Sequence, residues 1–385
     1  MIIRKLFVII LLAGLSGCSD PQKSIKNLPN LTTFSIEGVP EIQLIKDESF
    51  RGAQNSEVIK IGDITVDDDG KVYFVDEYNH KIQVVDADGN PVGSMGRGGG
   101  RPGEFRKLGN IEVHSGIIYG FDEGRKAMNT YNTRDFNFRK STQFSVQSLT
   151  GDSLKTAALY SAVILSGGNY LVAFQVVESP TNRPFYFYKA DESGAIISDQ
   201  LITFPNKSLF VESSSNGMTI MMMPYERETF LITNSEGNLF KLFSEEMVIR
   251  KFDPNGRYVE AWKYLVQKRT LNRSDALDLY DDVDIRRAIR GAKLPSNWPV
   301  VANFLVDNED RFWVATVSQN LENYTWYILG KQGALIGKVI LPRKVEIKAI
   351  QNGKVYAREI NKRTYAEEVV RYEIKEVMFN LKTQR

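Results

Sequence analysis

Hydrophobic and polar positions alternate in four short runs along residues 61–95, with turn-forming residues between the runs. The runs are rich in β-branched and aromatic residues, which favour extended strands. The first run ends at the acidic turn Asp67–Gly70, whose glycine can adopt a positive φ. Four antiparallel strands are therefore predicted, at Ile61–Val66, Lys71–Asp76, Lys81–Asp86 and Pro91–Met95.

The same pattern of strands and turns recurs along the rest of the chain in five weaker copies. The first turn of each copy contains one of the residues Gly70, Gly116, Gly168, Gly237, Asp310 and Gly353. Repeated units of four short strands are typical of a β-propeller. The pattern predicts an all-β fold over residues 31–380, a six-bladed propeller whose blades are four-stranded and antiparallel.

The sixth copy, Val345–Val377, contains at most three strands. The N-terminal segment Leu31–Lys46 contains two strand-like pieces outside the six copies. An open sheet edge exposes unpaired backbone groups, and closing the ring removes it. We therefore expect part of Leu31–Lys46 to supply the missing outer strand, so that the N- and C-terminal strands close the ring.

One helix is predicted at Asn272–Leu294, inside an insertion at 270–299 between blades four and five. Ser274 or Asp275 is expected to cap its start, and Gly291 with Pro295 to end it. This connection opens on the face that also carries the loops between the second and third strands. We expect the helix to cover part of the channel mouth there and to form one wall of a binding site.

Charge and cysteine content exclude several classes of function. The chain has 49 Lys and Arg against 47 Asp and Glu, so no strong field would attract nucleic acid, and we expect no nucleic-acid partner. One cysteine cannot form an internal disulfide, and two histidines leave little material for histidine-based metal or acid–base sites. We expect a monomer stabilised by its large core.

The N-terminus has the features of an export signal. Arg4 and Lys5 precede the apolar run Leu6–Leu15, which is too short to span a bilayer. The ending Leu15-Ser16-Gly17-Cys18 resembles a bacterial lipobox. That resemblance implies a signal peptide at 1–17, lipidation of Cys18 and a tether at 18–30. It also implies a lipid-anchored protein of the cell envelope, and Ser19 favours the outer membrane.

Blade one also resembles a known repeat. Asn79-His80 before the third strand and Gly103-Glu104-Phe105 leading to the next blade resemble the NHL repeat. Together with the lipobox, the chain resembles the six-bladed β-propeller lipoproteins of Bacteroidetes-type bacteria. This resemblance implies a fold and a location, and no specific activity.

Three polar residues begin the predicted inner strands of different blades, namely Asp63, Asn110 and Asn303. Carboxylate and amide oxygens at the axis could bind Ca²⁺, which is the single cofactor considered for this chain. Alternatively, these side chains only satisfy strand-end backbone groups that face the channel.

Five residues are candidates for ligand binding. Tyr78, Arg97 and Arg101 belong to connections that open on the helix face, and His114 follows an inner-strand valine. Trp298 follows the helix, and with Trp313 and Trp326 it either stacks on sugar rings or packs between blades.

The sequence contains neither a Gly-x-Ser-x-Gly motif nor a free cysteine nucleophile, since Cys18 is assigned to lipid. We therefore expect a binding or scaffold module for a protein, peptide or glycan partner. The alternative is a Ca²⁺-dependent hydrolase or lyase of the six-bladed type, with its site in the central channel.

Overall fold

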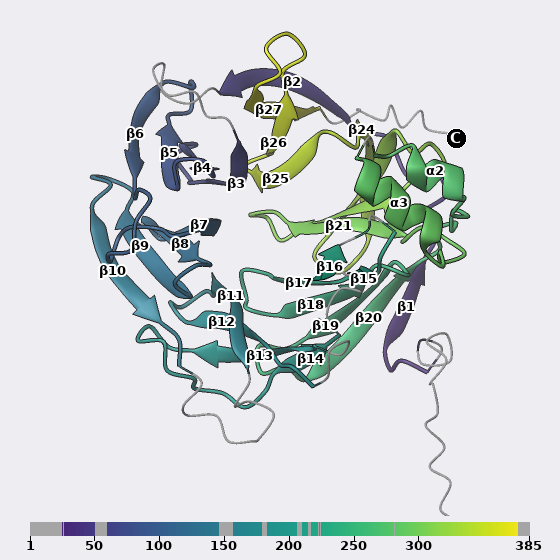
Figure 1. Cartoon of the computed structure of the whole chain (residues 1–385), viewed down its shortest axis with the longest axis horizontal. Coiled ribbons are helices and arrows are strands. Elements are labelled where there is room, and N and C mark those ends of the chain that lie inside the picture. The colour runs from purple at the N-terminus through teal and green to yellow at the C-terminus, as the bar shows by residue number, and fades with distance from the viewer. Residues whose placement is uncertain are drawn as a thin grey trace, which may run out of the picture.

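The computed structural model describes residues 25, 27–50, 60–145, 157–178, 183–205, 210–214, 217–221, 223, 225–280 and 282–375, with side chains left out for 210–221. The predicted signal peptide and Cys18 lie outside the described residues. Six sheets surround one axis like the blades of a propeller (Figure 1). The prediction of a six-bladed β-propeller is confirmed.

Each blade places its first strand next to the axis and its later strands progressively outward (Figure 1). Blade one contains β3 (Ile61–Val66), β4 (Val72–Asp76), β5 (Lys81–Val85) and β6 (Pro91–Met95). Blade two contains β7 (Leu108–His114), β8 (Ile117–Asp122), β9 (Ala127–Asn132) and β10 (Phe138–Gln143). Blade three contains β11 (Ala158–Ile164), β12 (Tyr170–Gln175), β13 (Phe185–Ala190) and β14 (Ile202–Phe204).

The other three blades follow the same antiparallel order. Blade four contains β17 (Thr229–Thr233), β18 (Leu239–Phe243), β19 (Val248–Phe252) and β20 (Tyr258–Tyr264). Blade five contains β21 (Val301–Val306), β22 (Phe312–Val317), β23 (Asn323–Leu329) and β24 (Leu335–Pro342). Blade six contains β25 (Glu346–Gln351), β26 (Lys354–Ile360) and β27 (Glu367–Lys375).

The N-terminal strand β2 (Gln43–Phe50) pairs antiparallel with β27 and completes blade six. This confirms that the two ends of the chain close the ring. The other N-terminal strand, β1 (Leu31–Phe34), instead pairs parallel with β20 as a fifth strand of blade four. Between them, Ile42 N donates to Lys338 O at 2.8 Å in blade five. We call residues 31–50 the N-terminal strap, because they join the outer edges of three blades.

The hydrophobic core consists of layers between neighbouring blades. Middle strands such as β4 and β22 are buried along their whole length, which explains their continuous apolar runs. Inner strands such as β3 alternate between buried and half-buried residues, because one face lines the channel. Phe50 of the strap is completely buried between blades six and one, in a cluster with Ile61 and Val369.

The insertion between blades four and five differs from its prediction. It forms two helices, α2 (Arg273–Leu277) and α3 (Val283–Gly291), instead of one. The Asp282 carboxylate caps α3 by accepting from Asp284 N and Ile285 N, both at 2.9 Å, so a new helix starts there. Asn272, not Ser274 or Asp275, precedes α2 and makes no side-chain cap bond. Along the described residues, no helix has both the length and the hydrophobicity that a membrane span needs.

The two helices pack over blade five at the outer part of the disc, away from the axis (Figure 1). Their apolar residues Leu277, Ile285 and Ile289 rest on the propeller next to the buried Trp298. The helices do not cover the channel mouth, so that part of the prediction is wrong. A short hairpin, β15 (Phe210–Ser214) with β16 (Gly217–Met221), fills the connection before blade four.

Candidate functional site

The channel edge of each inner strand has no neighbouring strand, and in blades one to three side chains from the adjacent blade bond to that edge. Asp63 Oδ2 accepts from Ile111 N at 3.0 Å, and Thr65 Oγ1 accepts from Val113 N at 3.3 Å. Asn110 Nδ2 donates to Ala162 O at 3.5 Å. These bonds link blades one, two and three around the axis and give hydrogen-bond partners to backbone groups that no strand pairs with.

The three candidate metal ligands are not gathered in one place. Asp63 and Asn303 line one cavity, whereas Asn110 is not among the residues of its wall. Asn303 Oδ1 accepts from Phe304 N at 2.8 Å, and the other two side chains are bonded as described above. Within the described part of the chain, no group of three or more His, Cys, Asp or Glu residues is arranged to hold a metal. The geometry favours the structural role for these residues.

A cavity of about 530 Å³ occupies the channel on the side of the first turn of each blade, and we call it the turn-side cavity. All six blades contribute to its wall. The polar and charged residues of the wall are Asp63, Thr65, Asp67, Asp68, Glu112, His114, Ser115, Ser166, Thr233, Asn234, Ser235, Asp307, Asn308, Asp310, Lys348 and Gln351.

Hydrogen bonds between turns hold the rim of the turn-side cavity. The Asp310 carboxylate of blade five accepts from Ser235 N at 2.9 Å and Ser235 Oγ at 2.7 Å in blade four. Gln351 Nε2 of blade six donates to Asp68 Oδ1 of blade one at 3.1 Å. The turns are thus fixed relative to one another before any ligand arrives, which lowers the entropic cost of binding.

The net charge of the turn-side cavity depends in part on the protonation state of Glu112. Burial raises the pKa of Glu112 to about 8, a hydrogen bond from Ile164 N opposes the shift, and the charge of Asp63 adds to it. Burial also raises the pKa of Asp63, against the effects of Ile111 N and the Lys348 ammonium. Near neutral pH, the Glu112 carboxyl is therefore largely protonated and can donate a hydrogen bond.

A second cavity of about 430 Å³ lies toward the other face of the disc, and we call it the helix-side cavity. It is lined by Asp63, Ala302, Asn303, Leu305, Tyr324, Trp326, Arg343, Val345, Glu346, Ile347 and Lys348. Asp63 and Lys348 line both cavities, so the two cavities meet along the axis. Neither wall includes a residue of the insertion at 270–299, so the predicted helical wall is wrong for both.

The five predicted binding residues are separated. Tyr78 is 70% exposed, whereas Trp298 is only 1% exposed and packs between α3 and blade five. His114 ends β7 and lines the turn-side cavity, at the face opposite to Tyr78. Trp313 and Trp326 are buried too, at 0% and 2%, in the layer between blades five and six, so packing between blades is confirmed for these two. Trp298 is buried against the helical insertion instead.

Arg97 and Arg101 belong to a glycine-rich loop that is bound to Glu104. Arg97 Nε and Nη2 donate to Glu104 Oε1 at 2.9 and 2.7 Å, and Arg101 N donates to Glu104 Oε2 at 2.9 Å. A Cβ at Gly99 would overlap the Glu104 carboxylate. The glycines therefore let the loop fold around an internal anion, and this is a structural role.

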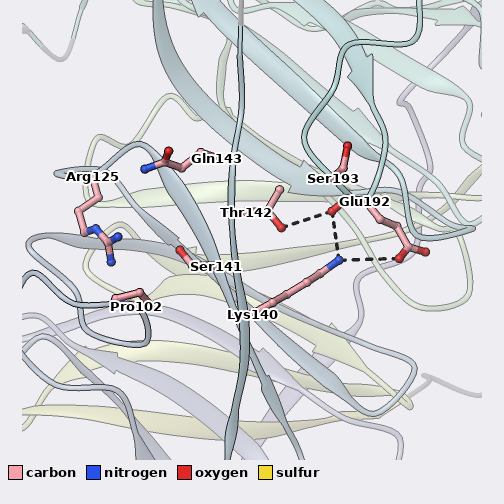
Figure 2. Close-up of a pocket in the computed structure, with 8 residues that line it drawn as sticks. All are labelled: Pro102, Arg125, Lys140, Ser141, Thr142, Gln143, Glu192 and Ser193. Carbon is pink, nitrogen blue, oxygen red and sulfur yellow. Dashed lines mark hydrogen bonds and ion pairs between the residues drawn. The ribbon is translucent and has the colours of Figure 1, made fainter.

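A pocket of about 700 Å³ lies between blades two and three at the outer strand β10 (Figure 2). Lys140 Nζ donates to Glu192 O at 3.1 Å and lies 3.7 Å from Glu192 Oε2. Arg125 lies on the other side of the strand (Figure 2). Its Nη1 donates to Arg101 O at 2.7 Å. Because these two cations already have partners, this pocket is a seam between blades, and the axis is the better candidate site.

Sequence reasoning missed Glu112, Lys348 and Arg343. Glu112 and Lys348 lie in inner strands, between apolar residues that face the core. Their position in the alternation could have identified them, because the other face of an inner strand looks into the channel. Arg343 follows β24 in a connection between blades, and no local pattern indicates its position.

The family comparison matches a large part of the chain. The model of a family described as 6-bladed beta-propeller, DUF5128, matches residues 26–276. No curated protein matches the sequence.

Solved structures support the same fold. A member of the DUF4221 family from Bacteroides vulgatus is 12% identical, with a TM-score of 0.55, over 87% of this chain and 98% of its own. A Bacteroides fragilis protein described as exported is 14% identical, with a TM-score of 0.50, over 90% of this chain and all of its own. Regucalcin from Agrobacterium tumefaciens, described as calcium-binding, has a TM-score of 0.41 at 8% identity, which is too distant to inform this site.

Proposed function

Because the chain belongs to the six-bladed β-propeller family DUF5128, we propose that it is a binding module whose ligand enters the turn-side cavity. One observation carries this proposal: all six blades contribute polar residues to a single cavity of about 530 Å³ on the axis. That volume lies within the range of small-molecule sites, about 300–1,000 Å³. A site built from every blade exists only in the complete ring.

The wall chemistry favours a ligand with several hydroxyl or amide groups. Carboxylate, amide and hydroxyl side chains predominate, together with His114 and Lys348. A protonated Glu112 adds a donor, while Asp67 and Asp68 offer acceptors. The end of a glycan or of a peptide has matching donors and acceptors, so the proposed partner is a glycan or a peptide, free or displayed on a protein.

The test is a screen of glycans and peptides against the full-length protein in detergent, followed by titration of each hit. Ser166→Trp places a large side chain at an exposed position of the cavity wall and should weaken binding at least tenfold. Ser193→Trp is a matched control, an exposed turn serine of the same blade outside the cavity. Equal affinity of all three proteins for every hit would refute this site. Turnover of a hit that depends on added Ca²⁺ would favour the hydrolase or lyase alternative.

We further propose that the module is held at the cell envelope by lipid on Cys18, most simply at the outer membrane. The support is the lipobox-like ending after a short apolar run. Cys18→Ala should release the protein from membranes and abolish labelling by a palmitate analogue, whereas Ser19→Ala should still be labelled. Membrane association and labelling that persist in Cys18→Ala would contradict the anchor.

A further inference from the structure

Arg343 is a half-buried arginine with two unsatisfied donors. The residue contributes to the wall of the helix-side cavity. Nε and Nη2 are both buried, and neither has a hydrogen-bond partner among the described residues. Those two atoms form one edge of the guanidinium, the edge that can bind both oxygens of a carboxylate side by side.

Other unsatisfied donors surround this arginine. Nε1 of Trp326, Nε1 of Trp298 and Nε of Arg269 are also buried without a hydrogen-bond partner in the described structure. The Arg343 guanidinium lies over the Tyr324 ring at 4.8 Å and over the Trp298 ring at 5.8 Å. Trp298 N donates to Arg269 O at 2.9 Å, which places Arg269 beside the same group. An indole N–H and a guanidinium can only donate, so the cluster lacks acceptors.

The acids of the cavity are already bound to other groups. Glu346 accepts from Arg358 Nη2 at 2.5 Å and lies 3.3 Å from Lys348 Nζ. Asp63 accepts from Ile111 N at 3.0 Å, in the ring of bonds between inner strands. Burial lowers the pKa of Arg343, and Arg269 adds to this effect while Tyr324 opposes it. Among the described residues, Arg343 therefore forms no ion pair with a carboxylate, an unfavourable state for a half-buried charge.

We propose that the helix-side cavity binds an oxyanion, presented as a carboxylate, sulfate or phosphate group of a small ligand, with Arg343 as the main donor. Both free atoms of Arg343 are covered in this conformation, so binding requires the guanidinium to turn toward the cavity. The proposal does not rest on the proposed function, because Ser166 and the turn rim are absent from this wall.

The cavity also limits the size of the ligand. About 430 Å³ exceeds the volume of an inorganic anion and leaves room for an attached ring. The half-buried Tyr324 provides an aromatic surface against which such a ring could stack. A sugar acid or a sulfated or phosphorylated sugar combines both features.

The test is calorimetric titration of the full-length protein in detergent with acetate, glucuronate, sulfate and inorganic phosphate, at constant ionic strength in chloride. Arg343→Met keeps an unbranched side chain without the charge, and Arg343→Lys keeps the charge without the planar fork. Arg287→Met is the control, because Arg287 is an exposed arginine on α3, 66% accessible and paired with Asp284 at 2.9 Å.

We expect wild type and Arg287→Met to bind at least one probe with equal affinity. Arg343→Met should bind that probe at least tenfold more weakly, and Arg343→Lys should be intermediate. The melting temperature of Arg343→Met in chloride should equal or exceed that of wild type, which shows that lost binding is not lost folding. Preference for acetate and glucuronate would identify a carboxylate ligand, and preference for sulfate or phosphate a tetrahedral one.

Two results would overturn the proposal: no binding of any probe by wild type, or unchanged affinity in Arg343→Met. A crystal soaked in selenate gives an independent measurement, with an anomalous peak expected within hydrogen-bond distance of Arg343. Ser166→Trp should bind the anion as wild type does, so failure of this site and failure of the turn-side site can be told apart.

Discussion

The two ends of the central channel differ in how their polar groups are satisfied. At the turn-side cavity, groups of one blade bond to the next blade, as Asp63 does to Ile111 N and Asp310 to Ser235. At the helix-side cavity, Arg343 and Trp326 retain buried donors without partners among the described residues. A repeated strand supplies a repeated partner, whereas a connection between blades follows no repeat. Arg343, which lies in such a connection, is therefore left without the partner that the repeat gives to inner-strand residues, and a ligand could supply one.

Both ends require a closed ring, so the largest expected effect comes from opening it. Phe50 of the N-terminal strap is fully buried. Its ring centroid lies 6.4 Å from that of Tyr356 and 5.3 Å from the central carbon of the Arg371 guanidinium. Phe50→Ala should reduce the free energy of unfolding by about 3–5 kcal/mol, the usual cost of such a cavity. Chemical denaturation of the purified wild type and variant measures this difference in the free energy of unfolding.

Ile45→Ala, on the same strand, is the control for that prediction. Ile45 is 39% exposed, so its truncation should cost less than about 1 kcal/mol. Binding at both cavities should weaken in Phe50→Ala under conditions where part of the protein is unfolded. Equal stability of the two variants would show that the strap does not hold the ring closed.

The closure of the ring could be predicted from sequence, because it follows from counting strands. The sixth copy lacked an outer strand, and an unpaired edge is costly enough to require a partner. The same reasoning could not assign β1 to blade four, since several outer edges remain open to a short strand. The position of α2 and α3 was also out of reach, because it depends on packing against Trp298 and Tyr225 from distant parts of the chain.

The candidate site was predictable to a similar extent. Asp63 and Asn110 were identified as channel residues by their place at the start of inner strands, and the structure gives them backbone partners. Arg343 was not, because its importance lies in the lack of a counter-ion among the described residues, and only the arrangement of neighbouring blades reveals that lack. Tyr78, Arg97 and Arg101 were proposed because they lie in loops. Tyr78 is in a separate loop, and the loop of Arg97 and Arg101 folds on Glu104.

A smaller effect is expected from the pH dependence of stability, which tests whether the turn-side cavity is shielded from water. The pKa of Glu112 is raised from 4.5 to about 8, mainly by burial. Between these values the folded protein holds a proton that the unfolded chain has lost, so stability should fall as the pH rises through this window. Glu112→Gln stays neutral and should lack this fall. It should exceed wild type at pH 9 by roughly 2 kcal/mol, since water in the cavity screens part of the full shift.

The matched variant is Asp63→Asn, which removes the neighbouring negative charge but keeps an oxygen to accept from Ile111 N. The pKa of Glu112 should then move down toward its ordinary value, and the fall of stability should begin at a lower pH. Urea unfolding at intervals between pH 4 and pH 9 follows the stability, and carbon NMR of labelled glutamate follows the pKa of Glu112. Parallel stability curves for wild type and Glu112→Gln across this range would mean that Glu112 is ionised like a surface carboxylate. The polar groups of the turn-side cavity would then be hydrated by bulk water, and the difference between the two ends would reduce to Arg343 alone.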